Sequence, residues 1–175
     1  MIYIFSGGSS SGKSELAEKY AVNLWNKSRK KGGGLYYYAT MRVYDQEGKQ
    51  RVEKHRKRRD GCGFITEECP SHLNTKITNS VILLECLSNR LANAMFSEGE
   101  EDPERVILDE INTLSEKNSV VIVTNEIFSD GEEYSPETEQ YRRMLGRLNC
   151  VLCRQAELVV ESVYGIPLVH KGEWI

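Results

Sequence analysis

Short apolar runs rich in β-branched and aromatic residues alternate along the chain with longer segments in which apolar residues recur every three or four positions. The short runs are apolar at successive positions, which is typical of strands buried on both faces of a parallel sheet. They predict five strands and, after the turn at Gly165, an edge strand: Ile2–Ser6, Leu35–Thr40, Val81–Glu85, Val120–Thr124, Leu158–Ser162 and Ile166–Val169.

The longer segments predict amphipathic helices, because their apolar residues fall on single stripes. These stripes run through Leu16–Leu24, Leu87–Met95, Ile107–Leu114 and Tyr141–Leu152. Strands that alternate with helices imply right-handed crossovers, and therefore an α/β fold with a mostly parallel sheet and helices on both of its faces. With no linker or repeat in 175 residues, we expect a single domain over residues 1–175.

A glycine-rich turn joins the first predicted strand to the first predicted helix. It matches the P-loop pattern G-x-x-x-x-G-K-[ST] with Gly7, Gly8, Ser9, Ser10, Ser11, Gly12, Lys13 and Ser14. Backbone N–H groups and the positive end of the helix dipole suit such a turn to the phosphates of ATP or GTP. Lys13 is expected to reach the β- and γ-phosphates, and Ser14 to bind Mg²⁺. The alternative is a glycine turn that only caps a helix.

A magnesium site next to a P-loop usually includes a carboxylate at the end of a neighbouring strand. Glu85 ends one predicted strand and Glu126 follows another. Both therefore lie where ligands bind in open α/β sheets, and we expect one of them, with Glu126 the choice beside Ser14, to serve the metal. The alternative for each is an acid that stabilises a helix N-terminus.

A strongly basic segment, Lys49–Arg59, follows the second predicted strand. At helical spacing Arg51, His55 and Arg59 share one face, where like charges repel unless an anion is bound. The segment is thus a candidate second anion site, and a neutral His55 is a competent nucleophile for a phosphoryl group. A solvated helix and an RNA-binding patch are the alternatives. The segment has no interleaved aromatic residues on which RNA bases could stack, so no nucleic acid partner is expected.

The composition limits the partners and the cellular location that we expect for this protein. The net charge of −3 gives no general attraction to nucleic acid or anionic membranes. No apolar run is long enough for a membrane span, and the apolar N-terminus reads as a strand, so we expect a cytoplasmic protein. An odd number of cysteines argues against a disulfide framework. A metal site built from Cys62, Cys69, Cys150 and Cys153 is a weak alternative to small buried residues on adjacent helical turns.

Taken together, the ordered motifs identify a family. The chain resembles the bifunctional adenosylcobinamide kinase/adenosylcobinamide-phosphate guanylyltransferases over nearly its full length. The resemblance rests on Gly7–Ser14, Tyr38-Ala39-Thr40, Arg51-x-x-x-His55-Arg56-x-x-Arg59, Thr66-Glu67-Glu68, Leu83-Leu84-Glu85-Cys86-Leu87, Val123-Thr124-Asn125-Glu126 and the segment Tyr141–Asn149.

This resemblance implies two reactions in cobalamin biosynthesis. One phosphorylates the aminopropanol hydroxyl of adenosylcobinamide, and the other transfers GMP from GTP to the product through a guanylyl-histidine. It implies GTP, ATP and Mg²⁺ as ligands, a corrinoid substrate, a RecA-like P-loop fold and a homo-oligomer, often a trimer. The family's histidine corresponds to His55. Its nucleotide-contacting positions carry over to Thr40, Met41, Arg42, Arg56, Lys57, Arg58, Arg59, one of Glu67 and Glu68, and Glu85, which the family uses for guanine.

The chain departs from the family pattern after Glu126. Ile127-Phe128 replaces the usual Val-Gly, and Ser129–Pro136 replaces a Gly-Val-Pro segment. A one-residue insertion leaves open whether Glu67 or Glu68 is the equivalent acid. Two other functions compete with the bifunctional enzyme. One is a P-loop kinase of a small metabolite, with the basic helix as a lid, and the other is a nucleotide-binding regulator without catalysis.

Overall fold

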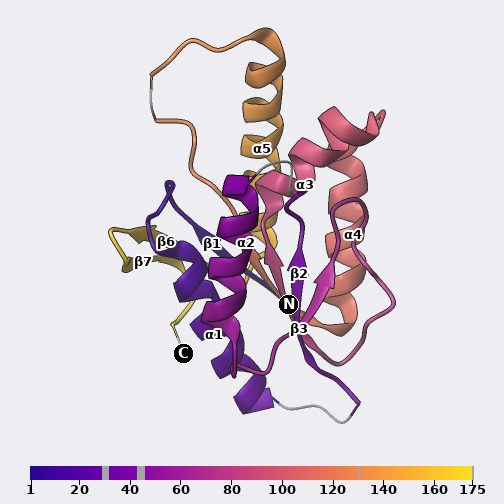
Figure 1. Ribbon diagram of the computed structural model, residues 1–175, viewed down its shortest axis with the longest axis vertical. Helices are drawn as coiled ribbons and strands as arrows, with labels where there is room; N and C mark the ends of the chain where they lie inside the picture. Colours follow the sequence, from indigo (N-terminus) through magenta and orange to yellow (C-terminus); the bar gives the residue numbers. More distant parts are fainter. Residues whose placement is uncertain (29–31, 43–45, 130, 175) are drawn as a thin grey trace.

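The computed structural model of the protein describes residues 1–28, 32–42, 46–129 and 131–174, and within the helix at 46–59 it describes only the side chains of residues 46, 50, 52, 53, 56, 57 and 59. The described strands form one sheet in the order β3-β2-β4-β5-β1-β6-β7 (Figure 1). Every neighbouring pair is parallel except β6 and β7, which are antiparallel. The strands are β1 (Ile2–Ser6), β2 (Leu35–Ala39), β3 (Ile65–Glu68), β4 (Val81–Glu85), β5 (Ser119–Val123), β6 (Leu158–Val163) and β7 (Ile166–Lys171).

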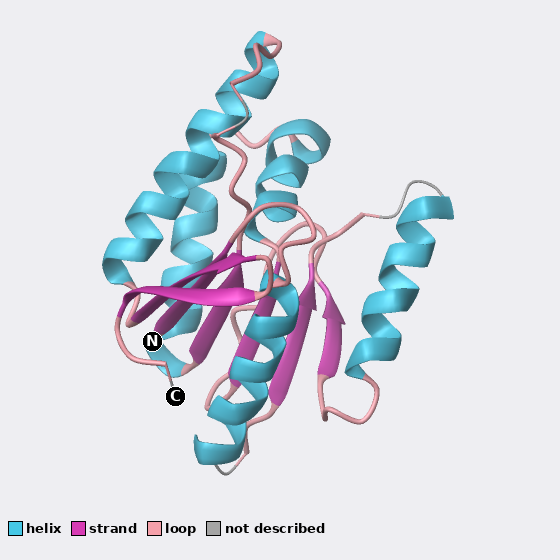
Figure 2. Ribbon diagram, turned by 90° about the vertical axis from the view of Figure 1, so that its left-hand side faces the viewer, coloured by secondary structure: helices cyan, strands magenta, loops and turns pink. Residues whose placement is uncertain are grey.

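Helices cover both faces of this sheet, as Figure 2 shows. On one face lie α1 (Lys13–Ser28) and α2 (Gln46–Arg59), and on the other lie α3 (Leu87–Asn93), the π-helix η1 (Ala94–Glu98), α4 (Pro103–Lys117) and α5 (Pro136–Gln155). The predicted α/β fold with a mostly parallel sheet is therefore confirmed.

Two apolar clusters fill the space between the sheet and its helices, because successive side chains of a strand point to opposite faces. On β2, Tyr37 belongs to the cluster under α1, whereas Tyr38 belongs to the cluster under α3, α4 and α5. The central strands β1, β4 and β5 are buried almost throughout. This burial explains why their sequences are apolar without alternation.

The edges of the sheet differ most from the sequence prediction. Strand β3 was not predicted, because Ile65-Thr66-Glu67-Glu68 has one apolar residue and is largely exposed at the edge beside β2. At the other edge β7 is the predicted edge strand. It extends to Lys171 and pairs antiparallel with β6, a direction that the sequence did not predict. Within the described residues, no helix is both long and apolar enough to cross a membrane.

Candidate nucleotide and guanylyl-transfer site

The P-loop joins β1 to α1 at the carboxyl edge of the parallel strands. Its backbone takes left-handed or nearly extended glycine angles at Gly7 (φ 151°) and Gly12 (φ 90°), and Ser10 has φ 57°. At Gly12 an added Cβ would lie 3.1 Å from the Cα of Gly165, so the residue also allows a close backbone approach. The turn thus has the glycine-dependent geometry that the sequence predicted.

The tip of the β6–β7 hairpin holds the P-loop in place. The backbone N–H of Gly165 and the hydroxyl of Ser162 both donate to the carbonyl oxygen of Ser11, at 2.7 and 2.6 Å. On the other side of the loop, the N–H of Glu126 donates to the carbonyl of Gly7 at 3.0 Å. Sequence reasoning missed the hairpin's role, because these partners lie about 150 residues from the loop along the chain.

Lys13 begins α1 and is buried. Its ammonium group donates to the carbonyl of Gly8 at 2.9 Å, which folds the side chain back over the loop. Burial lowers the pKa of this amine, an effect that the nearby Cys86 and Glu85 partly oppose. A phosphate that binds next to this buried ammonium group would stabilise its charge.

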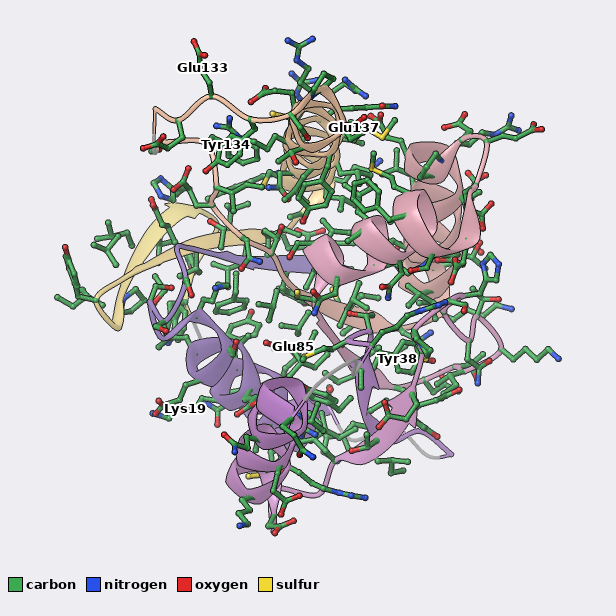
Figure 3. All side chains as sticks on the ribbon, turned by 45° about the horizontal axis from the view of Figure 1, so that its top comes forward. Lys19, Tyr38, Glu85, Glu133, Tyr134 and Glu137 are labelled. Atoms are coloured by element: carbon green, nitrogen blue, oxygen red, sulfur yellow. The ribbon has the colours of Figure 1, made fainter. Side chains whose placement is uncertain are left out.

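Ser14 faces the end of β4. Its hydroxyl donates to the Glu85 carboxylate at 2.6 Å. Thr40 fastens the backbone there: its hydroxyl accepts the N–H of Cys86 at 2.8 Å and lies 2.9 Å from the carbonyls of Glu85 and Cys86. Figure 3 shows Glu85 near the middle of the molecule, between α1, α2 and α3. A hydroxyl and a carboxylate therefore meet directly beside the P-loop.

Glu126 lies after β5, but its carboxylate turns to its own loop. One of its oxygens accepts the N–H of Phe128 at 2.8 Å and the hydroxyl of Ser129 at 3.0 Å. Of the two acids that the sequence offered, the structure pairs Ser14 with Glu85. A metal-binding role for Glu126 stays a prediction that these hydrogen bonds do not favour.

The segment after β2 is tied to the α3 side. Arg42 donates to Glu98 at 2.6 Å and to the hydroxyl of Ser71 at 3.0 Å, and Met41 beside it is half-buried. Glu98 also pairs with the fully buried Arg90, which bonds Glu110 in turn. This charged network ties the segment after β2 to η1 and α4, and the described hydrogen bonds of Arg42 go to this side of the sheet.

The register of the edge strands separates Glu67 from Glu68. Glu67 aligns with Tyr38 and accepts a hydrogen bond from Asn74 at 2.8 Å, on the face of α3 and α4. Glu68 aligns with Ala39, which aligns with Glu85, so these residues share the face of α1 and α2. Strands β3 and β4 are separated by two strand spacings, so the Cα atoms of Glu68 and Glu85 are about 10 Å apart along this edge.

Helix α2 covers this same face and carries His55. As the crossover between the parallel strands β2 and β3, it runs antiparallel to them and begins near their carboxyl edge (Figure 2). Arg56 and Lys57 are exposed, while Arg59 is buried against Tyr37. The side chains of Arg51, Lys54, His55 and Arg58 lie outside the described part of the structure.

Comparison with known proteins agrees with this arrangement. Residues 3–170 match the model of the family described as cobinamide kinase / cobinamide phosphate guanyltransferase. The chain belongs to this family. It is 33% identical over 193 residues to the bifunctional adenosylcobalamin biosynthesis protein CobU of Salmonella typhimurium, covering 98% of this chain and 100% of the relative. The Escherichia coli protein of the same name is 31% identical over 190 residues, covering 98% and 100%, and the Pseudomonas aeruginosa protein CobP is 28% identical over 178 residues, covering 95% of each chain.

Membership of the cobinamide kinase / guanyltransferase family confirms the resemblance that the motifs indicated. It also confirms nucleotides as ligands of this fold. The cysteine-metal alternative finds no support within the described residues: no cysteine there belongs to a group of His, Cys and acid side chains close enough to hold a metal, and Cys150 and Cys153 lie one turn apart on α5. In the described part of the chain, one cluster of His, Cys or acid side chains is compact enough to hold a metal: His72, Glu98 and Glu100. The Arg90 guanidinium contacts His72 and Glu98, so a cation already occupies the neighbourhood of this cluster.

Proposed function

We propose that this protein catalyses both reactions of its family on one face of one sheet. It phosphorylates the aminopropanol hydroxyl of adenosylcobinamide with ATP or GTP, and it then transfers GMP from GTP to the phosphorylated product through His55. The observation that carries the proposal is structural: the P-loop and the helix that contains His55 cover the same face, with Glu85 and Glu68 at its carboxyl edge.

In the kinase step the substrate hydroxyl attacks the γ-phosphorus. A new P–O bond forms, the bond between the β–γ bridging oxygen and the γ-phosphorus breaks, the nucleoside diphosphate leaves, and the hydroxyl proton passes to solvent. Lys13 and the N–H groups of the P-loop stabilise the negative charge that develops on the phosphoryl oxygens. The hairpin bonds to Ser11 support this role by keeping the loop in one shape before the nucleotide arrives.

Mg²⁺ is the metal that this site fits. It prefers oxygen ligands, and the Ser14 hydroxyl and Glu85 carboxylate already lie 2.6 Å apart beside the phosphate cradle. When bound, the ion would neutralise charge on the phosphate oxygens. We therefore assign the metal to Ser14 and Glu85 in preference to Ser14 and Glu126.

In the guanylyl step a ring nitrogen of His55 attacks the α-phosphorus of GTP. A P–N bond forms, the bond to the β-phosphate breaks, and pyrophosphate leaves. The phosphate of the corrinoid product then attacks the same phosphorus, which forms the new P–O–P linkage and frees the imidazole. Arginines on α2 are suited to the charge on the attacked phosphate because guanidinium groups pair with phosphate oxygens.

Glu68 is the acid that we assign to the guanine base. A carboxylate can accept both N1–H and the exocyclic amine, and Glu68 faces the nucleotide side, whereas Glu67 faces Asn74. We expect Glu68→Ala to raise the KM for GTP in guanylylation about tenfold or more. Steady-state kinetics with GTP would measure this change, and Glu67→Ala is the matched control, expected within about twofold of the wild type. A larger effect at Glu67 would reverse the assignment.

The whole proposal is tested with cobinamide and nucleotide together. Protein incubated with cobinamide, GTP and Mg²⁺ should yield cobinamide phosphate and then a GDP-linked corrinoid, which mass spectrometry separates. Cobinamide phosphate alone would support the simpler metabolite kinase, and neither product would support a regulator. A trimeric assembly remains a prediction from the family resemblance, and sedimentation would measure it.

A further inference from the structure

One contact joins the basic helix to the sheet. Arg59, in the last turn of α2, is 92% buried, and its guanidinium carbon lies 3.2 Å from the centre of the Tyr37 ring. Tyr37 lies in the middle of β2, and Phe64 meets its ring edge to face at 6.1 Å. A cation stacked on a buried aromatic face is stabilised by the negative charge of that face.

Arg59 stands out from the rest of its helix. Among the α2 side chains that the structure describes, it alone is buried, and Gln46, Gln50, Arg56 and Lys57 are exposed. Its Nε and Nη1 atoms are buried and have no hydrogen-bond partner among the described residues. A buried guanidinium needs compensation, and the described chain supplies it through the Tyr37 ring rather than through a carboxylate. Among the described side chains, the stack is the contact that ties this end of α2 to the sheet.

The stack between Arg59 and Tyr37 lies close enough to position 55 to influence how the helix places that residue. Residue 55 lies four residues before Arg59, so it is one helical turn, about 6 Å, nearer to the carboxyl edge and the P-loop. The helix backbone is continuous between positions 55 and 59, so a contact that fixes the rotation of α2 about its axis at Arg59 also fixes that rotation at position 55. Within the described residues, the P-loop is held by its bonds to β1, α1 and the hairpin, and no hydrogen bond joins it to α2.

We propose that Tyr37 is a positioning residue for guanylyl transfer: its ring seats Arg59 and thereby sets where the histidine helix lies. This inference rests on the proposed guanylyl-transfer function. It predicts that loss of the ring impairs guanylylation and leaves the kinase reaction nearly intact, because only guanylyl transfer uses α2 as the carrier of a nucleophile.

The test uses the intact protein with Tyr37→Leu, Tyr37→Phe and a control. Tyr37→Leu should slow formation of the GMP–enzyme adduct from GTP about tenfold, with kinase activity changed less than about threefold. It should also speed amide hydrogen exchange across residues 46–59, as measured by mass spectrometry. Tyr37→Phe keeps the aromatic face, so both its rate of adduct formation and its hydrogen exchange across residues 46–59 should match the wild type. Tyr38→Leu removes a ring of similar burial from the opposite face of β2 and should affect neither.

Each outcome has a distinct meaning. Equal losses of both activities in Tyr37→Leu, or wild-type exchange across α2, would overturn the positioning role. If Tyr37→Leu does not fold, Arg59→Lys is the second variant: it keeps the charge without the planar stack, and wild-type guanylylation in it would overturn the proposal. Failure of the wild-type protein to form any adduct would contradict the proposed function itself, whereas the exchange measurement would still test the Tyr37–Arg59 anchor.

Discussion

His55→Asn is expected to abolish the covalent GMP adduct while leaving phosphorylation of cobinamide largely intact. Asparagine preserves polarity but has no ring nitrogen that can attack phosphorus, so adduct formation should fall by about 1,000-fold or more. Kinase activity should stay within a few-fold, because the proposed mechanism assigns the γ-phosphate to the P-loop rather than to α2. The measurement is labelling with α-³²P-GTP and with γ-³²P-GTP: only the α-labelled nucleotide should mark the wild-type protein.

The chain offers a matched control, because it contains three histidines in all. His170 lies on β7, exposed and 2.9 Å from Glu161, far along the sheet from α2. His170→Asn should therefore label like the wild type, and the wild-type adduct should be lost in acid. Undiminished labelling of His55→Asn would place the nucleophile on another side chain and remove the basis of the guanylyl-transfer mechanism.

The parts of this site that were predictable from sequence are local ones. The P-loop is a contiguous motif between an apolar strand and an amphipathic helix, so both its position and its geometry followed. Strand β3 did not follow, since an exposed edge strand with a single apolar residue has no periodic signal. The choice between Glu85 and Glu126 also stayed open, because both follow strands and only side-chain packing decides which one meets Ser14.

The remaining features of the site, which the sequence did not predict, depend on contacts between segments that are distant along the chain. Tyr37 stands in a run of three tyrosines, and strand alternation alone indicates that it is buried, but nothing local shows that Arg59 will stack on it. The same holds for Ser162, whose partner Ser11 is at the other end of the chain. Strand parity could have found one further feature: once β3 is known, its pairing with β2 assigns Glu67 and Glu68 to opposite faces.

Lys13→Met should, in contrast to His55→Asn, remove both activities together. Lys13 is buried beside the P-loop, which we propose cradles the phosphates. Methionine keeps the length and apolar stem of the side chain but not its charge. Loss of one such preorganised group costs about 100- to 1,000-fold in rate, and nucleotide affinity should also fall. Titration calorimetry with GTP and both activity assays would measure these losses.

This substitution should not destabilise the ligand-free fold, and that separates its effect from misfolding. Burial lowers the pKa of Lys13 in the folded state, so the unfolded chain binds more protons between that pKa and the ordinary lysine value. The charged amine therefore opposes folding below this range, and its removal should leave the free energy of unfolding unchanged or higher. Lys19→Met is the control, since Lys19 is exposed on the same helix and pairs only with Glu15 at 2.7 Å in the described chain. A folded Lys13→Met protein that retained either activity within a few-fold would show that the P-loop lysine does not serve that reaction.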